Sequence, residues 1–138
     1  MLDLSRERDA HIDRRLRAEP IIWLSTARPD GRPHLVPVWF LWDGRTILIF
    51  SEPGAQKVRN LQHSRHVVLA LDTADEGEDV VIVEGEATLL QDGTVDSTLP
   101  AYAEKYGRLM VRIGTSPSLM AVRYTQAIRI IPARFLPG

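Results

Sequence analysis

The chain has 138 residues, 44% hydrophobic and 25% charged, so residues 1–138 are expected to form a single globular domain with a buried core. The net charge of -1 and a pI near 6.4 give no electrostatic reason to expect nucleic acid or a membrane as a partner. Cysteine is absent, which excludes disulfides and thiolate chemistry and agrees with an expected cytoplasmic location.

Turn signals and apolar alternation predict a mainly β fold with a few helices. Pro20 ends the first helix, and the turns Pro29-Asp30-Gly31-Arg32 and Asp43-Gly44 join the first three strands into a meander. Pro132 predicts an edge or a bulge in the last strand. Helices are expected over residues 5–18, 55–63 and 95–106. Six strands are expected over residues 21–28, 33–42, 45–51, 66–73, 80–91 and 121–135, with loops over 74–79 and 107–118.

Three of these strands carry consecutive apolar residues, at 21–24, 47–50 and 67–71. Side chains alternate along a strand, so both faces of such strands need cover. About six antiparallel strands and two or three short helices cannot supply that cover within one subunit. A barrel whose outer wall packs on a second copy is therefore expected, which predicts a homodimer; the alternative is that these strands lie under the helices.

The most informative stretch runs from Arg28 to Asn60 and contains Lys57, at the start of the second helix. Lys57 and Lys105 are the only lysines in the chain, beside fifteen arginines. Backbone amides, a hydroxyl and an ammonium that meet where a strand ends suit the phosphate of a cofactor on a barrel wall. An ordinary solvated lysine is the alternative for Lys57. For Trp39, packing in the core or at a dimer interface is the alternative.

Other site chemistries have little support. The four histidines lack metal-ligand spacing, so no metal site is expected. Asp75, Glu76, Glu78 and Asp79 are expected to form a solvated loop, without the apolar surroundings that would raise a carboxyl pKa. No Ser-His-Asp order and no GxGxxG motif occurs, which favours a cofactor enzyme in which the bound ring carries the reaction. No catalytic residue or proton donor can be named.

Three segments resemble the flavin and deazaflavin oxidoreductases of the split β-barrel fold, the pyridoxamine-phosphate-oxidase-like superfamily. They are residues 28–44, the run Lys57-Val-Arg-Asn-Leu61 and the run Val83-Glu-Gly-Glu-Ala87. The short length, the strand Pro37-Val38-Trp39-Phe40 and residues 101–107 resemble the actinobacterial branch that uses coenzyme F420.

The resemblance implies a six-stranded antiparallel split barrel that forms a homodimer, with the cofactor in a groove at the dimer interface. It implies that Lys57 binds the cofactor phosphate, with Ser51 and Gln56 beside it. It also implies that the ring lies against a set of apolar and amide residues: Val36, Pro37, Val38, Trp39, Phe50 and Asn60.

One departure bears on the cofactor. The resemblance implies a Ser-Arg-Lys run at the phosphate site of true pyridoxamine phosphate oxidases. This chain has Ala55-Gln56-Lys57 at that place, which argues against vitamin B6 oxidation. The resemblance thus implies an F420H2-dependent reductase that transfers a hydride to a small conjugated acceptor such as a quinone, enone or tetrapyrrole. The alternatives are an FMN-binding oxidoreductase of the same fold, or a protein that binds or carries a flavin, deazaflavin or haem without turnover.

Overall fold

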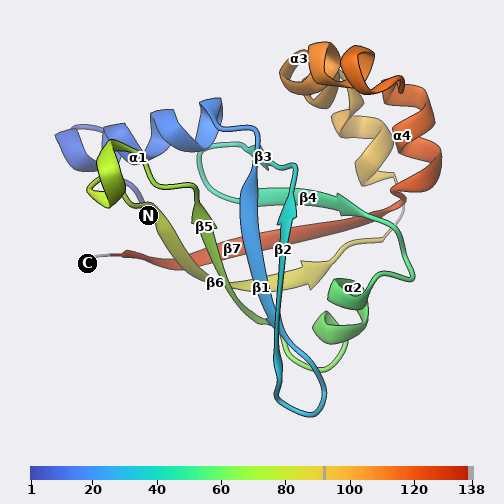
Figure 1. The fold of residues 1–138 in the computed structure, drawn as a ribbon, viewed down its shortest axis with the longest axis horizontal. Coiled ribbons are helices and arrows are strands. Elements are labelled where there is room, and N and C mark those ends of the chain that lie inside the picture. The colour runs from blue at the N-terminus through green and yellow to red at the C-terminus, as the bar shows by residue number, and fades with distance from the viewer. Residues whose placement is uncertain (92, 137–138) are drawn as a thin grey trace.

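The computed structural model describes residues 1–91 and 93–136. Within them, seven antiparallel strands form one curled sheet, accompanied by four α-helices and a short 3-10 helix (Figure 1). The strands are β1 (Ile22–Ala27), β2 (Pro33–Val38), β3 (Leu41–Trp42), β4 (Ile47–Ser51), β5 (His66–Leu71), β6 (Ile82–Leu89) and β7 (Gln126–Leu136). The helices are α1 (Glu7–Ala18), α2 (Gln56–Leu61), η1 (Asp75–Gly77), α3 (Thr94–Ile113) and α4 (Pro117–Arg123).

The sheet closes on itself as a split barrel. Its strand order is β2-β1-β5-β6-β7-β4-β3, so β2 and β3 lie at opposite edges. Yet only Trp39 and Phe40 separate these two strands in the chain. Val38 and Leu41, three residues apart, can be separated by at most about 11 Å, so the two edges must curl round until they lie close together. Figure 1 shows the result, with β1 and β2 crossing in front of β4 and β7. The expected mainly β split-barrel fold is confirmed.

The core fills the inside of this barrel with branched aliphatic side chains from most of the strands. Helices α1 and α2 lie at opposite ends (Figure 1) and contribute Leu16, Val58 and Leu61 to the same buried cluster. Strand β4 is buried on both faces, as expected. In β5, by contrast, Val67, Leu69 and Leu71 are buried whereas Val68 is exposed, so within one chain the outer face of β5 lies open.

Buried polar contacts attach α1 to the barrel. Asp13 accepts a hydrogen bond of 2.8 Å from the Trp42 indole and pairs with Arg17 at 2.9 Å. Arg15, almost fully buried, donates to Asp79 and to the carbonyl of Asp72. Asp79 also meets the His11 imidazole at 2.7 Å, and these hydrogen bonds lower the pKa of its carboxyl. The expectation of a merely solvated acidic loop is therefore wrong for Asp79.

A bulge in the β6–β7 ladder requires Gly85. The register shifts at this point, with Glu84 opposite Arg134 but Gly85 opposite Pro132, so Ala133 is the extra residue. A Cβ at Gly85 would lie 2.6 Å from the carbonyl oxygen of Ile131. The bulge predicted at Pro132 is confirmed, and it brings the β7 backbone too close to β6 for any side chain at residue 85.

Two sequence expectations about the chain order need correction. The second strand, expected over residues 33–42, breaks at Trp39-Phe40, so β2 pairs with β1 and β3 with β4; the sheet thus has seven strands instead of six, and the meander is interrupted. The loop expected over residues 107–118 is largely helical, because α3 continues to Ile113 and α4 begins at Pro117. The last strand consequently begins at Gln126, not at residue 121.

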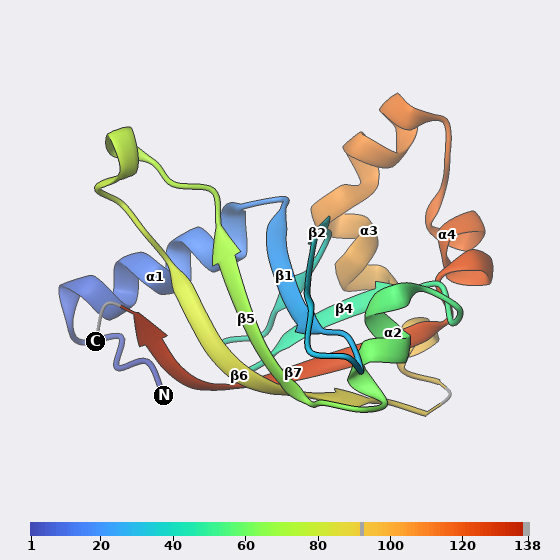
Figure 2. The same cartoon turned by 60° about the horizontal axis from the view of Figure 1, so that its bottom comes forward.

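Helices α3 and α4 form a helical hairpin that stands on one side of the barrel (Figure 2). Tyr102, Tyr106 and Met110, spaced four apart, form its buried stripe, which overrides the cost of Gly107 inside α3. Ser116 caps α4 by accepting a hydrogen bond from the Leu119 amide, and Pro117 occupies the first turn. In the part of the chain that the structure describes, no helix is both long and apolar enough to cross a bilayer.

Replacing Gly85 by alanine should destabilise the fold by about 1–3 kcal/mol, the usual cost of overpacking, because its Cβ meets backbone that cannot move aside. Chemical denaturation measures this loss. Gly54→Ala is the matched control, since a Cβ there meets nothing within 4 Å and its stability should change little. Equal stability of Gly85→Ala and the wild type would mean that the bulge is not as close as described.

Candidate functional site

A cavity of about 630 Å³ lies between one edge of the barrel and the helical hairpin. We call it the aromatic cavity. It is lined by Ile21, Pro37, Val38, Trp39, Phe50, Glu52, Ala55, Lys57, Tyr102, Ile113, Met120 and Tyr124. Its size is within the range of cofactor and ligand sites. Its walls come from β2, β4, the start of α2 and both helices of the hairpin, so segments distant in sequence meet here.

Aromatic rings make up much of the wall. The Trp39 ring stacks on Tyr106 with 4.5 Å between centroids and 2° between planes. Tyr102 packs against Phe50 at 5.0 Å and against Tyr106 at 4.9 Å. Burial raises the pKa of the Tyr102 phenol, so this hydroxyl stays protonated across the physiological range. The arrangement offers flat apolar surface to a planar ring.

Helix α3 holds the strand break at Trp39-Phe40 in place. The Tyr106 hydroxyl accepts a 2.8 Å hydrogen bond from the Phe40 amide and lies 2.8 Å from the carbonyl oxygen of Pro20, to which it can donate. Lys105 donates to the Phe40 carbonyl at 2.9 Å, and its ammonium lies 3.8 Å from the centre of the Phe40 ring. The backbone groups freed where the ladder breaks are thereby satisfied, which fixes Trp39 at the cavity wall.

The cavity contains one ammonium group, that of Lys57 on α2. Lys57 is half-buried, and burial lowers its pKa, while the nearby carboxylate of Glu52 acts in the opposite direction. Its side chain forms no hydrogen bond or ion pair with residues 1–91 or 93–136 in the structure. His34 on β2 lies close enough to Arg28 and Lys57 that their charges, after burial, lower its pKa. Its Nδ1 atom is buried and finds no partner among the described residues.

Five of the nine predicted cofactor residues line the aromatic cavity: Pro37, Val38, Trp39, Phe50 and Lys57. The other four do not. Val36 is half-buried on β2, and the Ser51 side chain is buried and donates to the Glu52 carbonyl at 2.9 Å. Gln56 donates to Asn60, and buried Asn60 donates to Thr26 at 2.9 Å, so this pair joins α2 to β1.

Sequence reasoning missed the part of the wall supplied by the hairpin. Tyr102, Ile113, Met120 and Tyr124 belong to α3 and the region of α4. Tyr102 lies in the helix expected over residues 95–106, but Ile113 was expected in a loop and Tyr124 in the last strand. The four-residue spacing of Tyr102 and Tyr106 was an available signal for a continuing helix. Glu52, directly after β4, also lines the cavity and was not singled out.

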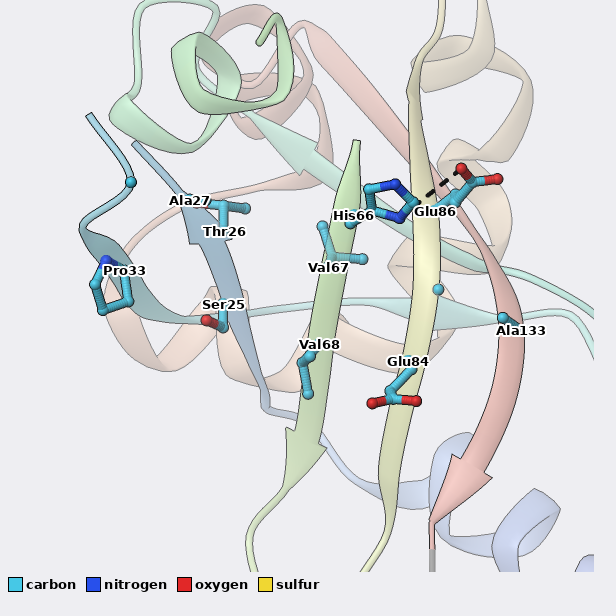
Figure 3. Close-up of a pocket in the computed structure, with 12 residues that line it drawn as sticks. Ser25, Thr26, Ala27, Pro33, His66, Val67, Val68, Glu84, Glu86 and Ala133 are labelled. Atoms are coloured by element: carbon cyan, nitrogen blue, oxygen red, sulfur yellow. Dashed lines mark ion pairs between the residues drawn. The ribbon is translucent and has the colours of Figure 1, made fainter. Parts of the chain in front are cut away.

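A second hollow, of about 530 Å³, lies on the outer face of the sheet (Figure 3). One cross-strand row on this face runs through Leu35, Ser25, Val68 and Glu84. Large apolar side chains remain exposed there: Leu35 by 60%, Val68 by 42% and Ile131 by 55%. Figure 3 also shows His66 and Glu86 at its rim, 3.9 Å apart. The floor is mostly small and apolar.

Metal chemistry finds no support in the described residues, where no three histidine, cysteine or carboxylate side chains gather closely enough to hold an ion. The aromatic cavity instead combines flat apolar walls with a single half-buried cation. This combination fits an aromatic ring system that carries an anionic group.

A family model described as pyridoxamine 5'-phosphate oxidase matches residues 9–136. The chain belongs to this family. The resemblance inferred from the sequence, to the split-barrel superfamily of flavin and deazaflavin oxidoreductases, is thereby confirmed.

Solved structures of similar fold include proteins with different described roles. An F420 reductase is 25% identical, covers 87% of this chain and 92% of its own, and has a TM-score of 0.65. The conserved hypothetical protein Rv2991 from Mycobacterium tuberculosis is 24% identical, with coverages of 91% and 81% and a TM-score of 0.74. The heme storage protein HutZ from Vibrio cholerae is 15% identical, with coverages of 93% and 90% and a TM-score of 0.69. The last two show only the shared fold.

The buried position of Lys105 should appear in the pH dependence of stability. Burial lowers its pKa to about 8, whereas in the unfolded chain it titrates near 10.5. Between these values the unfolded state binds more protons, so the free energy of unfolding should rise with pH, at most by about 1.4 kcal/mol per pH unit.

Denaturation of the wild type and of Lys105→Met between pH 7.5 and 9.5 measures this slope, below the range where tyrosines ionise in the unfolded chain. The wild type should gain stability relative to the variant as the pH rises. Parallel curves for the two proteins would contradict a buried Lys105.

Proposed function

We propose that this protein binds a deazaflavin in the aromatic cavity and acts as an F420H2-dependent reductase of a small conjugated acceptor such as a quinone, an enone or a tetrapyrrole. The observation that carries the proposal is the meeting of Trp39, Phe50, Tyr102 and Lys57 around one cavity of suitable size. The 25% identity to an F420 reductase over most of both chains supports the choice of cofactor.

The walls suit a tricyclic ring. In the described sheet, β2 is an edge strand paired only with β1, so its other edge can offer backbone hydrogen bonds to the polar rim of a pyrimidine-like ring. Trp39 and Phe50 cover the ring with apolar surface and exclude water from it. The stacking of Trp39 on Tyr106 holds the wall rigid while the ring binds.

Lys57 supplies the charge for the cofactor's phosphate. An ammonium already half desolvated loses little further hydration when it meets an anion, and a charge-assisted hydrogen bond is among the stronger polar contacts. Gln56 stands where the resemblance implies an arginine in pyridoxamine phosphate oxidases. Its side chain donates a hydrogen bond to Asn60 and accepts one from Arg59. A site with less cationic character at this point favours F420 over tightly held FMN.

When bound, a reduced deazaflavin supplies a hydride, and the acceptor takes up one proton besides. The protein's part is to hold the acceptor next to the ring and to keep water away, which requires position more than an acidic or basic side chain. Met120, Ile113 and Tyr124 form the apolar side of the cavity on which a conjugated acceptor can lie.

The same proposal includes a cytoplasmic homodimer that packs through the outer face of the sheet. Leu35, Val68 and Ile131 leave apolar surface exposed on this face, which a second copy could cover. A two-fold axis would bring each row of exposed residues onto its own copy, as self-complementary interfaces require.

Replacing Lys57 by alanine tests the cofactor site. The phosphate would lose a charge-assisted hydrogen bond worth about 1.5–3 kcal/mol, so the Kd for F420, measured by fluorescence titration, should rise about ten- to a hundredfold. The melting temperature of the empty protein should not change, because alanine is an excellent helix former. The affinity loss should shrink at high salt.

Arg59→Ala is the matched control, since the Arg59 guanidinium already donates to Gly54 and Gln56. An unchanged Kd in Lys57→Ala would contradict the placement of the cofactor phosphate at this end of β4. A protein purified yellow with FMN would favour the FMN oxidoreductase instead. A Soret band on haem titration, without F420 binding, would favour a haem carrier.

Sedimentation velocity tests the dimer. The wild type should sediment as a dimer at micromolar concentration, and Val68→Asp should shift it to monomer by placing an unpaired charge in the interface. Val111→Asp is the control, because Val111 is also an exposed valine but lies on α3. A wild-type monomer at micromolar concentration would overturn the dimer and any cofactor groove shared between copies.

A further inference from the structure

The aromatic cavity has a second charged residue at its rim. Glu52, which follows β4, lines the cavity and accepts a 2.6 Å hydrogen bond from Nε of Arg123 at the end of α4. Residues 52 and 123 are far apart in the chain, so this ion pair joins the barrel to the hairpin across the cavity. Tyr124, the next residue along, lines the cavity as well.

From this arrangement we infer that Arg123 is a second anion-binding residue of the cavity and completes, from the hairpin side, the phosphate site that Lys57 begins. The inference rests on the proposed function, since it assumes a cofactor that carries an anionic group. It adds a binding residue that no feature of the Lys57 region indicates.

The charge balance of the cavity favours such a residue. Among the lining residues Lys57 is the one cation and Glu52 the one anion, so the described wall is neutral overall. Glu52 is close enough to Lys57 for its charge to raise the pKa of that ammonium. An anion at Lys57 would therefore meet a neighbouring carboxylate, unless Arg123 compensates for it. With Arg123 at the rim, the site has a net positive charge.

The geometry of Arg123 leaves it able to bind a second group. Only Nε is used by Glu52, and neither terminal guanidinium nitrogen has a hydrogen-bond partner among the described residues. The side chain is 70% exposed, and its guanidinium carbon lies 5.7 Å from the centre of the Tyr124 ring. Glu52 thus orients the guanidinium, while the two remaining nitrogens form the fork that binds phosphate and carboxylate oxygens best.

Sequence provides independent support for a cationic hairpin. Residues 94–123 contain four basic residues and two acidic ones, Asp96 and Glu104, although the whole chain has a net charge of -1. Lys105 is engaged with the Phe40 carbonyl, and Arg108 and Arg112 lie on the exposed face of α3. Arg123 is the member of this set that reaches the rim of the cavity.

Fluorescence titration with F420 tests the inference on four variants of the full chain: Lys57→Ala, Arg123→Gln, Glu52→Gln and, as an exposed control on the same hairpin, Arg112→Gln. Arg123→Gln should raise the Kd about three- to tenfold and reduce its salt dependence. Glu52→Gln should lower the Kd, because it removes a carboxylate from an anion site. Arg112→Gln should leave the Kd unchanged.

The two variants are expected to change the Kd for F420 in opposite directions. This difference distinguishes a role of Arg123 in anion binding from a role only in attaching the hairpin to the barrel. If the pair served only as a structural link, Arg123→Gln and Glu52→Gln would weaken binding alike, which would overturn the inference. An unchanged Kd in Arg123→Gln, with a loss in Lys57→Ala, would also overturn it and leave the proposed function standing. If the wild type binds neither F420 nor FMN, the proposed function fails, and the second anion-binding residue fails with it.

Discussion

The architecture depends on the break at Trp39-Phe40, where the chain passes from one edge of the sheet to the other in two residues. A break in a ladder exposes backbone groups that would be costly to bury unpaired. Tyr106 and Lys105 satisfy the amide and the carbonyl of Phe40 from a helix more than sixty residues later. The same residues of α3 therefore stabilise the crossing between the two edges and fix the position of the hairpin.

The same constraint creates the aromatic cavity. Because Trp39 stacks on Tyr106, the hairpin stands off the barrel by the thickness of these rings, and space remains between β2, the end of β4 and the two helices. The hairpin contacts the barrel through this aromatic cluster, through the hydrogen bonds of Tyr106 and Lys105 to Phe40, and through the Glu52–Arg123 pair. These attachments differ in kind: the aromatic cluster is largely buried, whereas the Glu52–Arg123 pair is exposed to solvent.

Sequence patterns identified the fold well where local signals were strong. The turns at Gly31 and Gly44, the buried strands and the unusual lysine at position 57 all lie as expected. The pattern failed where tertiary packing outweighed local preference. Gly107 and the Ser116-Pro117 pair were interpreted as loop, but the buried stripe of α3 tolerates a glycine, and Ser-Pro begins a helix as readily as it ends one. Because α4 was not predicted, Met120 and Arg123 could not be placed near the cavity from the sequence. Nor does a sequence pattern show that the side chains of Ser51 and Asn60 form internal hydrogen bonds.

Strand β7 lies between β6 and β4, so it joins two otherwise separate pieces of sheet, β2-β1-β5-β6 and β4-β3. Its pairings connect segments that are distant in the chain, as in Ile49 with Ile128 and Ala87 with Ile130. Contacts between such distant segments form slowly, because a long loop must close first. Pairing of β7 should consequently be a late step in folding, and the two pieces of sheet that carry the walls of the aromatic cavity are held together only after it.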